Sequence, residues 1–207
     1  MTQPPRIARP RFGTSTILLM GVSIALNVVV GQLVGNVLKL PLYLDSLGTV
    51  LVGVLAGPLA GIVTGVLGNI AWGLTVPGGG SAVPFALTSA VIGLLAGLAG
   101  RRSLFAARRG PRGGVIVAVV GFVVGIVAAV VSAPIAYYVF GGSTGGGTDI
   151  LVAVFRNFTD SAFTATLLQS GISDPIDKTI VFLLVWAILL ALPASVKLLF
   201  PQGDRSI

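Results

Sequence analysis

The sequence predicts an all-α integral membrane bundle of six transmembrane helices, with an extra amphipathic or re-entrant helix on the outer side. Of the 207 residues, 55% are hydrophobic and only 9% are charged, whereas about 25% of the residues of a soluble domain are charged. The mean hydropathy is +1.02. Several apolar segments are long enough to cross the roughly 30 Å of hydrocarbon in a bilayer.

Six apolar segments lie between two short polar ends of the chain. We predict a cytoplasmic tail over 1–13, a membrane domain over 14–200 and a second cytoplasmic tail over 201–207. The first apolar segment lacks a clear cleavage site of the kind that ends a signal peptide, so we interpret it as a retained span. The predicted spans are 14–38, 42–56, 58–75, 83–100, 114–140 and 178–200.

The long apolar stretch from Lys39 to Trp72 decides the predicted topology. A single straight helix over it would be about 50 Å long at 1.5 Å per residue, which exceeds the roughly 30 Å of hydrocarbon. Gly57 and Pro58 lie near its middle, and proline is well tolerated in the first turn of a helix. We therefore predict a helical hairpin whose two outer ends meet at the same membrane surface.

The distribution of charge agrees with this topology. Most basic residues fall on one side of the predicted spans, at Arg6, Arg9, Arg11, Arg101, Arg102, Arg108, Arg109, Arg112, Lys197 and Arg205. Five of the six acidic residues fall on the other side, at Asp45, Asp149, Asp160, Asp174 and Asp177. Because basic residues are enriched in cytoplasmic loops, we expect a multi-pass protein of the cell membrane with both termini in the cytoplasm.

Residues 141–177 are predicted to form an outer loop that contains a helix. The segment opens with GGSTGGGT, which is typical of a flexible linker. Leu151 and Val154 then follow helical spacing, while Arg156 and Asp160 lie on another face. A seventh span would bury these two charges at an unfavourable depth, so an amphipathic or re-entrant helix is favoured.

Polar and aromatic side chains are predicted to gather at the outer ends of the spans, where Gln32 and Tyr138 also lie. Aromatic walls with a few hydrogen-bonding groups suit a small, flat, polar solute. The candidate substrate-binding residues are Asn36, Tyr43, Asp45, Asn69, Trp72, Tyr137, Arg156, Asn157 and Asp160.

Several of these residues also have a purely structural interpretation. Asp45 could cap the start of the second span, because a carboxylate satisfies free N–H groups there. Trp72, Tyr137 and Tyr138 could be aromatic residues of the membrane interface.

Two further structural interpretations concern polar side chains. Arg156 and Asp160 are four residues apart and could pair with each other on a wet helix face. Asn69 is harder to explain structurally, because an amide inside a membrane usually faces a partner or a cavity.

The composition excludes several functional classes. The chain has no Cys and no His, which removes thiol nucleophiles, the commonest general base and most zinc sites. The glycine-rich stretches lack the GK[ST] ending of a nucleotide-binding loop. We therefore predict no enzyme activity, no catalytic residue, no cofactor and no metal, and we assign the net charge of +7 to loops at the bilayer rather than to nucleic acid.

Gly21, Ala25 and Val29 form a ladder of small or modest side chains on the first span. Such a ladder allows close approach of another helix in lipid. The neighbouring helix could belong to this chain or to a separate membrane subunit.

The pattern LPLYLDSLGTVLVGVLAGPLAGIVTGVLGN, followed by a glycine-rich loop and PFALTSAVIGLLAG, resembles the substrate-binding (S) components of energy-coupling factor transporters. The resemblance implies a vitamin or related micronutrient as substrate. It also implies a coupling transmembrane subunit and two ABC-type ATPase subunits as partners. In that family an alanine-rich ladder on the first helix docks the coupling subunit, and Ala25 matches it.

Two other functions remain open at this point. A standalone secondary transporter would normally hold acidic residues deep within its spans, and Asp45, near the surface, is the only acidic residue in the predicted spans. A membrane sensor module is the other alternative.

Overall fold

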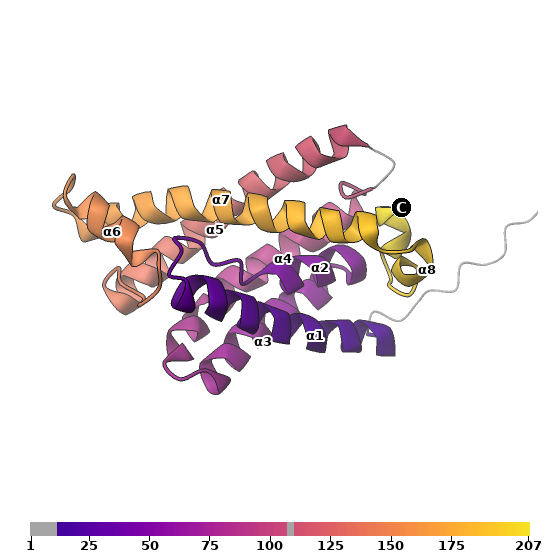
Figure 1. The fold of residues 1–207 in the computed structure, drawn as a ribbon, viewed down its shortest axis with the longest axis horizontal. Coiled ribbons are helices and arrows are strands. Elements are labelled where there is room, and N and C mark those ends of the chain that lie inside the picture. The colour runs from indigo at the N-terminus through magenta and orange to yellow at the C-terminus, as the bar shows by residue number, and fades with distance from the viewer. Residues whose placement is uncertain (1–11, 107–109) are drawn as a thin grey trace, which may run out of the picture.

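The computed structural model describes residues 12–106 and 110–207, and within these ranges the regular elements are helices, without a strand (Figure 1). The predicted all-α class is therefore confirmed. Most of the predicted N-terminal tail lies outside the described residues, as do five of the basic residues used to predict orientation: Arg6, Arg9, Arg11, Arg108 and Arg109.

The N-terminal half contains the predicted helical hairpin. Helix α1 (Thr14–Gly31) continues as the π-helix η1 (Gln32–Val37). Helices α2 (Leu47–Ala56) and α3 (Pro58–Thr75) follow, joined by Gly57, whose φ of 103° is open to glycine but strained for other residues. The turn at Gly57-Pro58 is thus confirmed.

The predicted start of the second span at residue 42 is wrong. Residues 38–46 form an irregular loop, and α2 has only 10 residues. All ten are buried, because the other helices surround this short element. The loop leaves Tyr43 and Asp45 outside regular helix, at the end of the bundle.

The C-terminal half contains the longest helices. The 3-10 helix η2 (Gly79–Phe85) leads into α4 (Ala86–Arg101), which is followed by α5 (Pro111–Phe140). The remaining elements are α6 (Asp149–Arg156), α7 (Ala162–Ala191), α8 (Ala194–Lys197) and the 3-10 helix η4 (Gly203–Ser206).

Helix α7 corrects two sequence predictions. A span over 178–200 was expected, but the helix begins at Ala162 and ends at Ala191, just before Pro193. The outer segment is not one helix, since α6 and α7 are separated at 157–161. Ser161 fixes the start of α7 by accepting a hydrogen bond from the Thr164 N–H at 3.2 Å.

The extent of α7 also shows that the predicted position of two acidic residues, in the outer loop, is wrong. Asp174 and Asp177 lie in the interior of α7, where both are buried. Lys178 follows directly and pairs with Asp177. Because these charges compensate one another, a continuous helix can carry them through an otherwise apolar bundle.

Four helical segments in the described ranges are long and apolar enough to cross a membrane: Thr14–Val37, Pro58–Thr75, Gly79–Arg101 and Pro111–Phe140. These segments indicate a membrane protein. Helix α2 is shorter, and the 30 residues of α7 include three charged side chains close together. The described helices run back and forth along one bundle, with α7 beside α5 (Figure 1).

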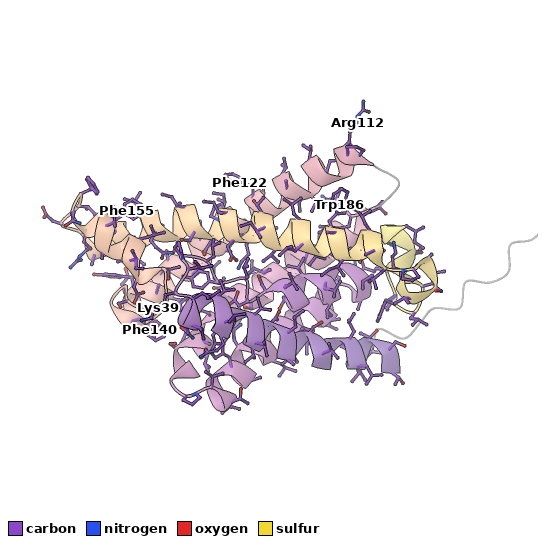
Figure 2. All side chains as sticks on the ribbon, viewed as in Figure 1. Lys39, Arg112, Phe122, Phe140, Phe155 and Trp186 are labelled. Atoms are coloured by element: carbon purple, nitrogen blue, oxygen red, sulfur yellow. The ribbon has the colours of Figure 1, made fainter. Side chains whose placement is uncertain are left out.

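The two ends of the bundle carry different parts of the chain. The Gln202 N–H donates to the Leu55 carbonyl at 2.8 Å, so the C-terminal segment packs against the end of the hairpin that carries the Gly57-Pro58 turn. Arg112 lies at this end, whereas Phe140 and Phe155 lie at the other (Figure 2).

The small-residue ladder of α1 lies on the outside of the described bundle. Gly21, Ala25 and Val29 are all exposed, and a Cβ built on Gly21 would meet no atom within 4 Å. The opposite face of α1, with Met20 and Asn27, is buried. The ladder therefore does not serve internal packing among the described residues.

Candidate functional site

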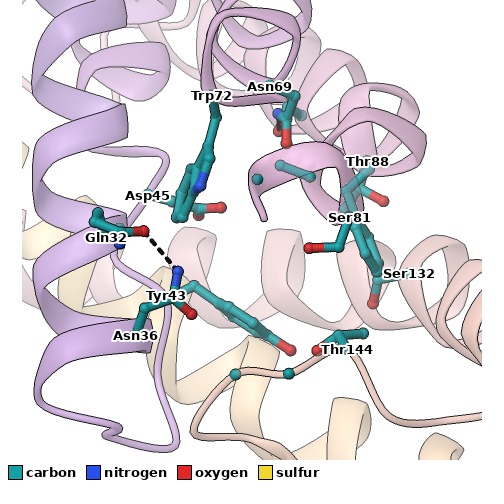
Figure 3. A pocket seen from close by; sticks show the side chains of 18 of the residues that line it. Gln32, Asn36, Tyr43, Asp45, Asn69, Trp72, Ser81, Thr88, Ser132 and Thr144 are labelled. Atoms are coloured by element: carbon teal, nitrogen blue, oxygen red, sulfur yellow. Dashed lines mark hydrogen bonds between the residues drawn. The ribbon is translucent and has the colours of Figure 1, made fainter. Parts of the chain in front are cut away.

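A cavity of about 380 Å³ lies at the end of the bundle opposite the C-terminus. Its walls come from α1 and η1, the loop 38–46, the end of α3, η2, α4, α5, the glycine-rich loop between α5 and α6, and α7. Figure 3 shows polar and aromatic side chains from these elements around one space. The predicted residues on its lining are Asn36, Tyr43, Asp45, Asn69 and Trp72, together with Gln32.

The loop 38–46 is fixed to α7 by Asp177. The Oδ1 of this carboxylate accepts hydrogen bonds from the Tyr43 N–H at 2.9 Å and the Leu44 N–H at 2.8 Å. Leu44 has a left-handed φ of 49°, which is unfavourable for a branched side chain. The two charge-assisted hydrogen bonds offset that strain and hold the loop over the cavity wall.

Tyr43 ties the same loop to the start of α6. Its hydroxyl donates to the Thr148 Oγ1 at 3.0 Å. Burial raises the pKa of the Tyr43 phenol above its ordinary value. The phenol therefore stays protonated and remains a hydrogen-bond donor.

Lys178 is the centre of a group of charges on the cavity wall. Its Nζ donates to the Asp177 Oδ2 at 2.5 Å and lies 3.7 Å from the Asp45 Oδ1. The side chains of Asp177 and Lys178 are almost fully buried, whereas that of Asp45 is 25% exposed. Asp174, one turn before Lys178, accepts a hydrogen bond from the Ser132 Oγ at 2.6 Å.

Asp45 does not cap α2. The N-cap residue is Ser46, and no side chain makes a capping hydrogen bond there. Burial raises the pKa of the Asp45 carboxyl, and the Lys178 ammonium opposes that shift. The carboxylate therefore faces the lysine and the cavity rather than the helix terminus.

Asn69 connects α3 to α4 at the cavity wall. Its Nδ2 donates to the Ser89 Oγ at 2.6 Å and to the Gly65 carbonyl at 3.1 Å. The neighbouring Thr88 also lines the cavity, and its buried Oγ1 has no hydrogen-bond partner in the described structure. This wall therefore presents an amide and an unpaired hydroxyl.

Trp72 and Phe85 supply the aromatic part of the wall, together with Tyr43. The indole of Trp72 packs so closely on Gly31 that a Cβ at this glycine would overlap it. Phe85 stacks on Phe140 with ring centroids 5.9 Å apart. On the part of the lining that η1 contributes, the Asn36 Nδ2 donates to the Gln32 Oε1 at 2.7 Å (Figure 3).

Four predicted substrate-binding residues lie outside the cavity. Arg156 ends α6 and Asn157 follows it, and both are exposed, as is Asp160. The helix stops before Asp160, so the predicted one-turn spacing of Arg156 and Asp160 is absent, and these two described residues form no ion pair. The amide of Asn157 instead donates to the Ala153 carbonyl at 3.3 Å.

Tyr137 is the fourth of these residues. It packs edge-on against Tyr138 and Phe163, with ring centroids 5.1 Å and 5.3 Å apart. Tyr138 is 77% exposed. This aromatic cluster agrees with the structural interpretation of the tyrosines as residues of a membrane interface.

Sequence reasoning missed the contribution of α7 to the site. Asp174 and Lys178 line the cavity, as does Ser132 from α5. The spacing of Asp174 and Lys178 by four residues was a usable signal, since it places both side chains on one face of a helix. Pro175 obscured it, because proline usually marks a boundary rather than the interior of a helix.

The lining residues can contact a small solute with both aromatic and polar groups. The lining combines three aromatic rings, three side-chain amides, several hydroxyls and a group of charged side chains, and no group of acidic residues in the described ranges is placed to hold a metal ion. Comparison of the chain with known protein families, curated proteins and solved structures gave no match.

Proposed function

We propose that this chain is a membrane-embedded binding subunit that captures a small polar solute, a vitamin or related micronutrient, for ATP-driven uptake by partner subunits. The observation that carries this proposal is the cavity of about 380 Å³ at one end of an apolar helical bundle. Its volume falls in the range of small-molecule sites, roughly 300–1,000 Å³. Its rings can stack on a flat solute, while Asp45 and Asn69 fix the orientation of that solute.

The proposal includes six transmembrane spans. Helices α2 and α7 add to the four segments that are long and apolar enough to cross a membrane. The shortness of α2 is compatible with a membrane position, because its ten residues are buried by protein rather than exposed to lipid. The 30 residues of α7 extend about 45 Å at 1.5 Å per residue.

The proposed orientation places the cavity on the outer side of the cell membrane. Arg101, Arg102 and Arg112 belong to the end of the bundle that carries the C-terminus. Basic residues favour the cytoplasmic side, so both termini would lie in the cytoplasm. A solute would then enter the cavity from outside.

The proposed partners are a coupling transmembrane subunit and two ABC-type ATPase subunits, as in the S components that the sequence resembles. The exposed ladder of Gly21, Ala25 and Val29 supports this part, because its side chains are free to contact another helix. The chain itself would carry no catalytic activity.

The test is direct binding. The full chain is purified in mild detergent, small molecules that co-purify are identified by mass spectrometry, and a vitamin panel is titrated against the emptied protein. We expect one compound to bind and Asn69→Ala to weaken that binding, while Asp204→Asn, an exposed carboxylate at the other end, leaves it unchanged. The proposal is wrong if no compound binds and none co-purifies.

A standalone secondary transporter is the second candidate, and one observation favours it. Two buried carboxylates, Asp174 and Asp177, lie inside α7, where ion-coupled carriers hold acidic residues. Reconstitution of the chain alone in liposomes separates the two candidates. Uptake driven by an ion gradient without ATPases would favour the carrier, and its absence favours the binding subunit.

A further inference from the structure

The cavity wall carries an excess of negative charge. Lys178 forms ion pairs with two carboxylates, those of Asp45 and Asp177, and a third carboxylate, that of Asp174, lies one turn earlier on α7 and also lines the cavity. Among the lining residues, Lys178 is the single basic side chain in the described structure. The formal charge of the group with all four ionised is therefore about −2, and three of its members, Asp174, Asp177 and Lys178, are buried.

Lys178 already forms a close ion pair within the protein, with Asp177. Its Nζ donates to Asp177 at 2.5 Å, and Asp177 also receives two backbone N–H groups from the loop 38–46. Asp177 is thus satisfied without a solute. Lys178 lies farther from Asp45, at 3.7 Å, which is beyond normal hydrogen-bonding distance.

Two carboxylates on the cavity lining are left incompletely compensated. The Asp45 carboxylate lies 3.7 Å from the Lys178 Nζ and otherwise interacts with its own backbone N–H, and Asp174 accepts one hydrogen bond, from Ser132. Burial of an ionised carboxylate without a close partner is costly. A positive charge placed in the cavity would offset that cost, whereas a negative charge would increase it.

The rest of the lining favours an organic cation over a metal ion. Trp72, Tyr43 and Phe85 present aromatic rings, and the face of such a ring attracts a cation electrostatically. No group of acidic residues in the described ranges is positioned to hold a metal. The Oγ1 of Thr88, which is 7% exposed and has no partner in the described structure, offers a contact for a polar substituent.

We propose that the solute of this cavity is an organic cation with a flat ring, whose positive charge lies between Asp45 and Asp174 and whose ring contacts Trp72. This inference rests on the proposed function, since it names the class of solute that the same site would take. A neutral or anionic micronutrient would leave the two carboxylates uncompensated.

Three ring compounds of similar size and different charge test the inference. The purified full chain is titrated with nicotinamide methylated on its ring nitrogen, which is a cation, with its neutral isostere meta-toluamide, and with the nicotinate anion. Binding is measured by equilibrium dialysis. We expect the cation to bind at least about tenfold more tightly than the neutral isostere, and the anion to bind most weakly.

Two variants locate the charge. Asp45→Asn and Asp174→Asn should each remove most of the preference for the cation over the isostere, while the matched control Asp204→Asn should keep it. If Asp174→Asn leaves the preference unchanged, Asp174 carries a proton rather than facing a cation, and the two-carboxylate site is wrong. The comparison of the three compounds on the unchanged protein needs no variant and so does not depend on how the variants fold.

The failures of the two proposals are distinguishable. Equal or tighter binding of the neutral or anionic compound overturns the cation inference and leaves the binding subunit intact. If none of the three compounds binds, the charge of the solute that co-purifies with the protein tests the inference instead. A cationic solute supports the inference, and a neutral or anionic solute overturns it. If nothing binds and nothing co-purifies, both proposals are wrong.

Discussion

The Nζ of Lys178 lies 3.7 Å from the Oδ1 of Asp45 and joins the middle of α7 to the loop that precedes α2. The two residues are separated by most of the chain, yet they meet at one wall of the cavity. This contact makes α7 part of the site and couples the charge of the site to the stability of the bundle.

Lys178→Met should strongly destabilise the protein. The change leaves the fully buried Asp177 carboxylate without its ammonium partner, and breaking a buried pair in this way costs about 3–5 kcal/mol. We expect a clearly lower midpoint of thermal unfolding in detergent. Lys39→Met, at an exposed lysine outside the cavity, should change the midpoint little. Equal midpoints for the two variants would contradict the assigned role of Lys178.

The sequence was sufficient to predict the hairpin and half of the site. The apolar stretch was too long for one span, and Gly57-Pro58 supplied a local turn, so the ends of α2 and α3 away from that turn were expected to lie near each other. As a result, Asp45, Asn69 and Trp72 were correctly expected near one another. These inferences depend on chain length and local geometry, which a sequence carries directly.

The contribution of α7 could not be predicted in the same way. Charged residues in an apolar chain are normally placed in loops, so Asp174 and Asp177 were assigned to the outer loop, and Lys178 was placed at the first residue of the last span. Their burial is acceptable only because Lys178 reaches Asp45 and Asp177 binds the loop 38–46. Such compensation comes from tertiary contacts between distant segments, which no local pattern reports.

Tyr43→Phe should loosen the loop 38–46. The change removes the hydrogen bond to the Thr148 Oγ1 and leaves that buried hydroxyl without its donor, at a cost of about 0.5–1.5 kcal/mol. Hydrogen exchange measured by mass spectrometry should show faster exchange in peptides that cover the loop. Thr148→Val, alone and combined with Tyr43→Phe, closes a double-mutant cycle, and strictly additive effects would show that the hydrogen bond is not made in solution.

Gly31→Ala should reduce solute binding, while Gly21→Ala on the same helix should not. A Cβ at Gly31 would overlap the Trp72 indole and approach the Asp45 Cβ, whereas a Cβ at Gly21 would meet nothing within 4 Å. Both changes raise helix propensity similarly, by about 1 kcal/mol, so the pair isolates the steric effect at the cavity. The dissociation constant of the co-purifying solute is measured for both variants. Equal weakening of binding by the two would show that Gly31 has no specific role at the cavity.

Ala25→Trp should prevent assembly with a coupling subunit and leave solute binding unchanged. Ala25 is exposed on the outer face of α1, away from the cavity lining, and an indole there would keep a second helix from approaching closely. Val115→Trp is the matched control, because Val115 is 66% exposed on α5, outside the ladder. Co-purification with candidate coupling and ATPase subunits from the same genome provides the measurement. If both variants assemble equally well, the exposed ladder is not the docking surface, and the face of α1 must be explained by contact with lipid alone.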